Sequence, residues 1–222
     1  KGVVLQREKR IQDPRNALEY RVGKLLGSSS DRFNFYECEP MSEKGRPCIL
    51  KVAQTKEVNG LLDKETFLLQ VMADYALSLE SKNTGKKPYN YGSFFPSPIG
   101  SFIPEGQDGR RVSVIGFPRD IEVLSQLVPV SALAQVDRVW VDPRTSAWIV
   151  GKLLKVVDFA HAQGISVGSV TSDNTVIERD LHGVIVFDWT RASHHGEGRV
   201  PASVAGKELS NVAEIGIAAL GG

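Results

Sequence analysis

The order of its periodic segments is the feature that most constrains the fold of this 222-residue chain. Alternating apolar positions, which are typical of half-buried strands, begin near Tyr20 and recur at 33–38 and 48–52. Turn-forming residues between the last two segments favour an antiparallel hairpin. After one helical segment, two more strand patterns follow at 99–103 and 112–117. The first half of the chain is therefore predicted to form an antiparallel sheet that carries one helix.

That helix is expected over 63–79, where apolar residues recur every three or four positions and give one buried stripe. After Pro118 helical spacing dominates, interrupted by a short apolar hairpin at 175–177 and 183–187. The helices of this second half are expected over 121–139, 147–162 and 203–220. A sheet-rich half followed by a helix-rich half indicates an α+β fold.

The change of pattern near Pro118 also predicts two lobes within one domain. A chain of this length can bury a core without help from disulfides or metals. We expect a polar lead-in over 1–19, an N-terminal lobe over 20–117 and a C-terminal lobe over 118–222.

Charge and cysteine content limit the classes of partner. With 27 basic and 26 acidic residues the formal net charge is +1, so no overall field attracts nucleic acid or an anionic membrane. The two cysteines, Cys38 and Cys48, are too few for a disulfide framework, and no Cys/His spacing is typical of zinc. No apolar stretch approaches the roughly 20 residues that span a bilayer. We expect a cytoplasmic protein whose sequence here indicates no nucleic-acid or membrane contact.

Four polar side chains lie where phosphoryl transfer from a nucleotide would need them. This chemistry uses a cation on the phosphates, an acid that holds the cation, and oxygen ligands for Mg²⁺. Lys51 lies in the apolar strand pattern 48–52, and Glu65 lies in the first turns of the following helix. Asn174 and Asp188 flank the predicted hairpin and could converge on one metal ion.

These residues carry a resemblance to the protein kinases that covers nearly all of the chain after Ala17. The segment 48–52 resembles the Val-Ala-Ile-Lys strand, and Glu65 resembles the helix glutamate that pairs with its lysine. The segment 164–174 resembles a His-Gly-Asp-x-x-x-x-Asn catalytic loop, and 187–190 resembles the Asp-Phe-Gly site. The four matches follow one another in the family's order.

The resemblance implies a two-lobed kinase-like fold with an antiparallel-sheet N-lobe, one helix in that lobe, and a mainly helical C-lobe. It also implies ATP with Mg²⁺ as the cofactor. Gly27, Lys51 and Glu65 would lie at the nucleotide, and Asn174 and Asp188 would be the metal ligands.

Two departures from the family pattern affect catalysis. Ser169 stands in place of the catalytic Asp, and Val167 stands in place of the His. A serine hydroxyl has neither charge nor useful basicity near neutral pH, so it cannot take the acceptor proton as a carboxylate does. In the segment that resembles the glycine-rich loop, Gly27 is the one glycine left, and Asp31 adds a negative charge close to the phosphates. We therefore expect no catalytic residue and weak nucleotide binding, or none.

The segment after Asp188 is short and basic. It contains Arg191, His194, His195 and Arg199, and no Ala-Pro-Glu motif precedes Glu208, which aligns with the acidic start of the family's next long helix. The chain ends before the family's remaining helices would begin. These features predict a shortened C-lobe without the surface that orders an acceptor peptide.

The leading hypothesis is a pseudokinase, a regulatory domain recognised by another protein, with little or no phosphotransfer. The alternative is a divergent active phosphotransferase of the serine/threonine-kinase type, or a nucleotidyltransferase, that uses Lys51, Asn174 and Asp188. Each side chain also has an ordinary structural use. Lysine at a strand end and glutamate on a helix are commonly solvated, while Asn and Asp commonly shape turns.

Overall fold

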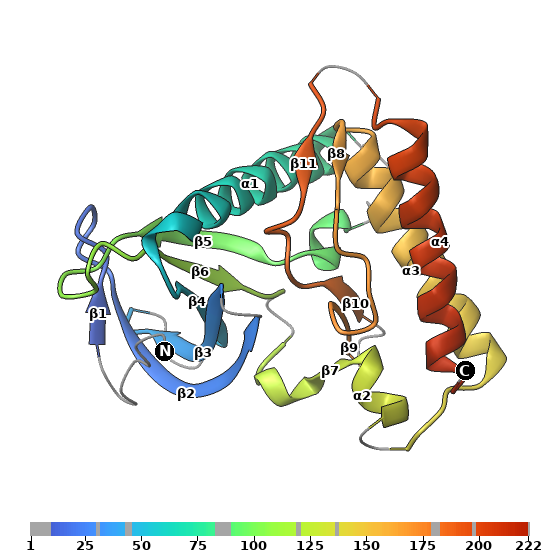
Figure 1. Cartoon of the computed structure of the whole chain (residues 1–222), viewed down its shortest axis with the longest axis horizontal. Coiled ribbons are helices and arrows are strands. Elements are labelled where there is room, and N and C mark those ends of the chain that lie inside the picture. Colours follow the sequence, from blue (N-terminus) through green and yellow to red (C-terminus); the bar gives the residue numbers. More distant parts are fainter. Residues whose placement is uncertain are drawn as a thin grey trace. The chain divides into compact units, whose positions relative to one another are not determined.

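The computed structural model describes residues 10–29, 32–42, 46–82, 90–118, 121–135, 138–178, 183–196 and 199–221 (Figure 1). The chain divides into two compact units. The first consists of Lys1–Gln70 and Ser97–Leu124, and the second of Val71–Pro96 and Ser125–Gly222. In the described ranges the first unit contains a six-stranded sheet, and the second contains a three-stranded sheet and a two-stranded ladder.

The sheet of the first unit is antiparallel throughout, with strand order β1-β2-β3-β4-β6-β5. The five predicted strands are present: β2 Glu19–Ser29, β3 Phe33–Pro40, β4 Cys48–Ala53, β5 Ser97–Phe102 and β6 Val112–Gly116. The additional strand β1, Arg10–Gln12, lies in the stretch expected as a lead-in and pairs with β2. The expected turn between β3 and β4 is described at Arg46 and Pro47, and its residues 43–45 lie outside the described ranges.

The two faces of this sheet differ because side chains alternate along each strand. One face carries an apolar core to which Tyr36, Leu50 and Val114 contribute, with exposures of 1%, 0% and 0%. The opposite face of β3 and β4 carries the register partners Phe35 and Lys51. Every residue of β4 is buried, as expected for a central strand.

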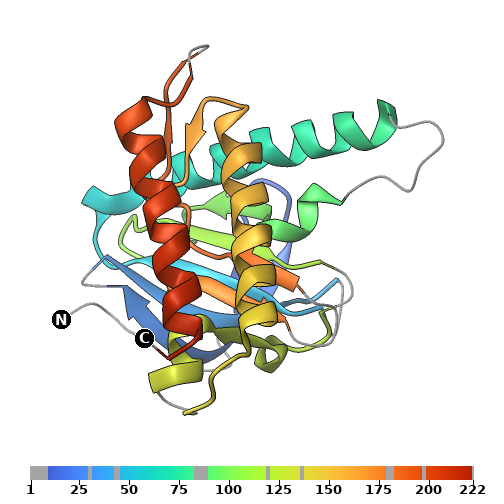
Figure 2. The same ribbon diagram turned by 90° about the vertical axis from the view of Figure 1, so that its right-hand side faces the viewer.

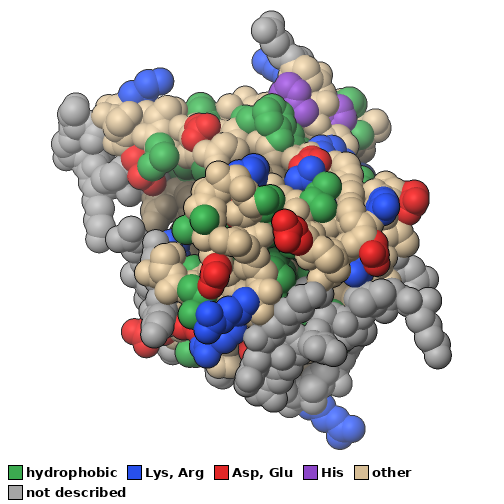
Figure 3. Space-filling model, turned by 90° about the vertical axis from the view of Figure 1, so that its left-hand side faces the viewer, with side chains coloured by type: hydrophobic (Ala, Val, Ile, Leu, Met, Phe, Trp, Pro, Cys, Tyr) green, Lys and Arg blue, Asp and Glu red, His purple; other side chains and the backbone are tan. Residues whose placement is uncertain are grey.

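Ion pairs link two neighbouring strands of the same sheet. Arg21 pairs with Glu39 across β2 and β3, and Lys24 pairs with Glu37 at 3.1 Å. On the face drawn in Figure 3, acidic and basic side chains are interspersed rather than gathered into patches of one sign. Each exposed pair contributes little to stability, about 0–1 kcal/mol.

Helix α1, Asn59–Lys82, follows the short helix η1, Lys56–Val58, and extends beyond the predicted 63–79 at both ends. The spacing predicted a buried stripe that included Phe67, Leu68 and Met72. The structure buries Leu68 and Met72 but leaves Phe67 63% exposed, so the buried stripe is rotated from the predicted one. Glu65 is a polar member of this stripe and has zero exposure. The buried apolar members are Leu62, Leu68, Leu69, Met72 and Ala76.

Two long helices pack side by side in the second unit (Figure 2). They are α3, Pro143–His161, and α4, Ala202–Ala219, close to the helices predicted there. The close approach requires Gly216, because an added Cβ would lie 2.6 Å from Val150 Cγ2. Within the described ranges, none of the helices combines the length and apolar character needed to cross a bilayer.

The helix predicted over 121–139 is wrong. The segment instead forms η3 Leu124–Gln126, β7 Leu127–Pro129 and the short helix α2 Val130–Gln135. Pro129 explains the break, because proline disfavours a helical conformation in the residue before it and removes a backbone donor. β7 pairs with β9, so this stretch supplies a strand to the second unit.

The predicted hairpin is confirmed as β9, Thr175–Glu178, paired with β10, Gly183–Val186. Two further strands, β8 Ile165–Ser166 and β11 Ser193–His194, form a separate antiparallel ladder. The hairpin lies near the short helix η2, Tyr91–Phe94. Aromatic side chains fill this part of the unit: Phe95 contacts both Phe159 and the fully buried Trp189.

A pair of leucines on the same sheet tests the packing of the first unit. Leu50→Ala removes a side chain with no exposure, so we expect unfolding to become easier by about 2–5 kcal/mol through lost burial and a residual cavity. Leu25→Ala removes a side chain that is 44% exposed and should change stability by about 0.5 kcal/mol or less. Urea unfolding followed by fluorescence measures both. Equal effects of the two substitutions would contradict the assignment of the core face.

Candidate functional site

An ion pair between Lys51 and Glu65 is the first candidate group. Lys51 lies in β4 and Glu65 in α1, and Lys51 Nζ is 2.6 Å from Glu65 Oε1. Both side chains have zero exposure. The ring centroid of Phe35 on β3 lies 5.6 Å from Nζ, a distance at which the face of an aromatic ring attracts an ammonium group. The structure brings together the cation and the acid that the sequence predicted as partners.

This pair connects α1 to the sheet of the first unit. Burying two charges carries a desolvation penalty that their attraction roughly offsets, so the pair adds little net stability. Removing one partner alone would leave the other charge buried and would cost about 3–5 kcal/mol. The pair therefore fixes the orientation of the helix more than it stabilises the fold.

Gly27, the predicted phosphate-loop glycine, lies in β2 opposite Phe35 of β3. Two register shifts in β2 precede it, which bend the strand at this point. A Cβ added at Gly27 would meet nothing within 4 Å. Packing within the chain therefore does not require glycine here. The next residues of the predicted loop, Ser30 and Asp31, lie outside the described residues.

In the second unit, Asn174 connects two segments through its side-chain amide. Its Nδ2 donates to the backbone carbonyl oxygens of Ser169, at 2.7 Å, and Asp188, at 2.9 Å. Its Oδ1 accepts the backbone N–H of Asp188 at 2.6 Å. The residue is 7% exposed. Asn174 thus ties the loop at Ser169 to the segment that begins at Asp188.

The oxygens of these two residues also bear on the expected metal. Asn174 Oδ1 has a second lone pair besides the one that Asp188 N–H uses, and a carboxylate offers about four acceptor sites, one of which takes the Thr190 N–H at 3.1 Å. No cluster of three or more His, Cys, Asp or Glu side chains occurs in the part of the chain that the structure describes. Amide and carboxylate oxygens are ligands that Mg²⁺ accepts together with water and phosphate oxygens. A metal role for Asn174 and Asp188 therefore stays a prediction.

The loop at 167–170 carries no acidic side chain. Val167 has no exposure, and Ser169 is the residue that the sequence analysis aligns with a catalytic aspartate. Gly168 has φ +73°, and an added Cβ would collide with the backbone carbonyl of Arg191. The left-handed conformation and the close approach together restrict position 168 to glycine.

Glu208 organises the same loop, which the sequence analysis did not predict. Its Oε1 accepts the N–H of Gly168 at 2.5 Å, and its Oε2 lies 2.7 Å from His161 Nε2. The carboxylate therefore joins α3, α4 and the loop while being 3% exposed. The signal was present in the sequence, because Glu208 falls on the buried stripe of α4 with Val212 and Ile215, and an acid on an apolar stripe indicates a buried partner.

The basic segment after Asp188 is held against the start of the loop. β11 pairs with β8, and the N–H of His195 donates to the carbonyl of Gly164 at 2.8 Å. His195 Nε2 lies 2.9 Å from Ser166 Oγ, and Ser166 is 4% exposed. These contacts give Ser166 and His195 a structural role, and they leave His194 exposed at the surface.

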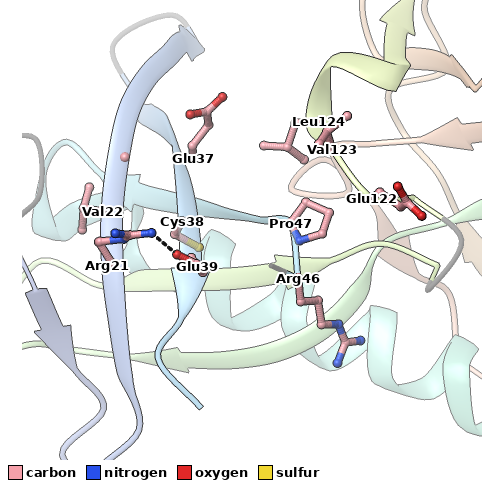
Figure 4. A pocket seen from close by; sticks show the side chains of 11 residues that line it. Arg21, Val22, Glu37, Cys38, Glu39, Arg46, Pro47, Glu122, Val123 and Leu124 are labelled. Atoms are coloured by element: carbon pink, nitrogen blue, oxygen red, sulfur yellow. Dashed lines mark hydrogen bonds and ion pairs between the residues drawn. The ribbon is translucent and has the colours of Figure 1, made fainter. Parts of the chain in front are cut away.

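A cavity of about 510 Å³ in the first unit is separate from the ion pair (Figure 4). Carboxylates and cations line it together, and Arg21 pairs with Glu39 in its wall. An apolar wall formed by Pro47, Val123 and Leu124 faces them. Lys51 and Glu65 are not among its lining residues.

Cys38 also lines this cavity. Hydrogen bonding to Cys48, its register partner on β4, together with burial, raises the pKa of the Cys38 thiol well above its ordinary value. The thiol is therefore protonated at neutral pH and is a poor nucleophile. The thiol in this cavity is thus not activated for covalent chemistry.

Solved protein-kinase structures share this architecture. The structure of vaccinia related kinase 3 matches with a TM-score of 0.63 and 18% identity, covering 87% of this chain and 53% of that chain. The fold is that of the protein kinases. The kinase PK-1 of Cydia pomonella granulovirus matches with a TM-score of 0.52 and 14% identity, covering 80% of this chain and 53% of that chain.

These matches confirm the predicted α+β, two-lobed kinase-like fold. The chain spans about half the length of the two kinase structures, with 53% coverage of each. No protein-family model and no curated protein matches the sequence. At 18% and 14% identity the likeness shows the fold alone, because one fold hosts many functions.

Substitution of two glycines tests the loop geometry. Gly168→Ala forces a Cβ into the carbonyl of Arg191 and into a left-handed conformation, which by itself costs about 1–2 kcal/mol. We expect a marked loss of stability for the second unit. Gly206→Ala on α4 is the control, because an added Cβ there meets nothing within 4 Å and alanine favours a helix by about 1 kcal/mol. Thermal unfolding of both variants measures the difference, and a Gly168→Ala protein as stable as the control would rule out the close approach.

Proposed function

We propose that this chain is a pseudokinase, a kinase-like regulatory domain that binds another protein and transfers little or no phosphate. The observation that carries the proposal is Ser169, which stands where the resembled catalytic loop has its aspartate. Without a carboxylate there, nothing at that position accepts the proton of an attacking hydroxyl.

The bonding of the loop supports this function. Gly168 donates to Glu208, and the carbonyl of Ser169 accepts from Asn174. The loop thus keeps its conformation although it lacks a catalytic acid. This suits a domain that a partner recognises by its surface and that does not need to turn over a substrate.

Weak binding of ATP with Mg²⁺ is compatible with the same residues. Lys51 and Glu65 supply the cation and its acid partner, and Asn174 and Asp188 supply oxygens for a metal ion. When bound, Mg²⁺ would neutralise phosphate charge. The protein would contribute the ammonium group of Lys51 and the oxygen ligands of Asn174 and Asp188. Gly27 alone offers little backbone contact to phosphates, so we expect low affinity.

We propose a protein partner in the cytoplasm. The formal net charge of +1 gives no reason to expect nucleic acid as a partner. The short segment after Asp188 is engaged with β8 through β11, which favours a fixed surface over an acceptor-peptide groove. These features describe the domain as a recognition module.

An active divergent transferase is the second candidate, either a phosphotransferase or a nucleotidyltransferase. The buried pair of Lys51 and Glu65 favours it, because a catalytic site of this kind depends on the same pair. Loss of the acid at position 169 counts against it, since general-base help is typically worth about 10²- to 10⁴-fold in rate.

A phosphotransfer assay distinguishes the two functions. Radiolabelled ATP with Mg²⁺ is incubated with the wild type, with Ser169→Asp and with Asp188→Ala, and both autophosphorylation and a generic acceptor are followed. We expect no turnover above background in any of the three, because restoring one carboxylate leaves a short segment without an acceptor surface. Robust wild-type turnover that Asp188→Ala abolishes would establish the transferase instead.

The metal roles predict how nucleotide binding responds to chelation. If Asn174 and Asp188 hold Mg²⁺ between protein and phosphates, ATP binding weakens when EDTA replaces Mg²⁺. Calorimetry of the wild type under both conditions measures this. Asp188→Ala should remove the difference, while Asp173→Ala, an exposed neighbour of Asn174, should keep it. Equal affinity with EDTA and Mg²⁺ would refute the metal roles.

A further inference from the structure

Helix α4 carries apolar side chains on its exposed surface as well as on its buried one. Its buried stripe contains Val212, Ile215 and Ala219 and packs beside α3. A second stripe, the outer stripe, is exposed and consists of Leu209, Ala213, Ile217 and Leu220. These residues are spaced by three or four positions, so they share one side of the helix. The three large members are 48%, 57% and 44% exposed, whereas helices with so much apolar surface are normally covered all round.

Trp140 extends the outer stripe at the C-terminal end of α4. A Cβ added at Gly221 would lie 2.4 Å from Cδ1 of the indole, and the N–H of Val141 donates to the carbonyl of Ala219 at 3.0 Å. The indole therefore lies against the end of the helix, and it is 61% exposed. In Figure 2 no other described element of the second unit crosses in front of α3 or α4. Exposed apolar surface of this kind marks a site of association.

Two charged side chains lie beside the outer stripe. Lys207 and Glu214 are both exposed and are seven residues apart, which is close to two helical turns, so they lie on the same side of α4. Glu208, the remaining charged residue of this helix, is buried and pairs with His161. The exposed surface of α4 thus combines an apolar stripe with one cation and one anion. Reversing the direction of the helix exchanges the two charges, so this surface is complementary to itself.

We propose that the outer stripe is a homodimer interface, in which α4 packs antiparallel against α4 of a second copy of this chain. A twofold axis beside Ser210 brings Lys207 of each copy next to Glu214 of the other. It also sets Leu209 of each copy against the small side chain of Ala213 of the other. The formal net charge of +1 causes little repulsion between two copies. The inference uses neither the nucleotide site nor the serine at position 169, so it does not rest on the proposed function.

Sedimentation velocity over a wide range of protein concentration measures the association. We expect the wild type to pass from monomer to dimer as its concentration rises. Ile217→Lys should raise the dissociation constant about a hundredfold, because the twofold axis repeats the substitution and each lost apolar contact costs about tenfold. Leu77→Lys, which replaces a 63% exposed leucine on α1, is the matched control and should dimerise like the wild type. Both lysines lie within the last two turns of a helix, so neither charge opposes the helix dipole.

Charge reversal tests both the orientation and the identity of the partner. Lys207→Glu and Glu214→Lys each place like charges together at two symmetry-related positions, and we expect each to weaken dimerisation about fivefold. The double variant exchanges the charges and restores both pairs, so its dissociation constant should return to that of the wild type. A partner other than a second copy keeps its own charges and would not compensate for the exchange.

Each outcome decides the proposal. A wild type that stays monomeric at every concentration assigns the outer stripe to a different partner and overturns the homodimer. A dimer that a folded Ile217→Lys protein still forms, or a double charge variant that does not recover, overturns it as well. If Ile217→Lys loses its thermal transition, the charge variants decide the question without it. Phosphotransfer by the wild type would overturn the pseudokinase function and leave the sedimentation result unaffected.

Discussion

A lysine and a glutamate that are both out of contact with water can remain charged only as partners, and this constraint governs the first unit. Lys51 lies in the central strand β4 and Glu65 on the buried stripe of α1, so their 2.6 Å contact specifies which side of the helix faces the sheet. Apolar packing alone would tolerate small rotations of α1. A rotation large enough to separate the pair would leave each charge buried without its counterion, which is costly. The pair thus sets the orientation of α1, and the buried leucines of the helix pack in that orientation.

A second buried carboxylate has the same organising effect in the other unit. Glu208 accepts a hydrogen bond from the backbone of Gly168 and pairs with His161, so a single side chain sets the positions of two helices and one loop. Asn174 extends this arrangement to Asp188. The loop is held at its backbone, and its conformation does not depend on the side chain at position 169.

Most elements of the fold were predictable from the chain, and the failures have identifiable causes. The strands and the helices α1, α3 and α4 have strong periodicity and appear close to their predicted positions. The helix predicted over 121–139 failed because apolar spacing was given more weight than Pro129, which breaks it. Strand β1 was missed because three residues are too few to show an alternating pattern. At the candidate site, Lys51 and Glu65 were predicted as partners, whereas the contacts of Phe35, His161 and Glu208 were not.

The sequence by itself determined the order and type of the main elements, the absence of an acid at position 169 and the presence of a lysine and a glutamate on suitable elements. These are local properties, fixed by side-chain identity and by spacing along the chain. Tertiary structure alone decided that the ring of Phe35 lies beside Lys51 and that Glu208 reaches both His161 and Gly168. It also decided that the side-chain amide of Asn174 bonds to the backbone of Ser169 and Asp188. The physical reason is that burial and hydrogen-bond partnership belong to pairs of residues distant in sequence, and only the packed chain determines which of them meet.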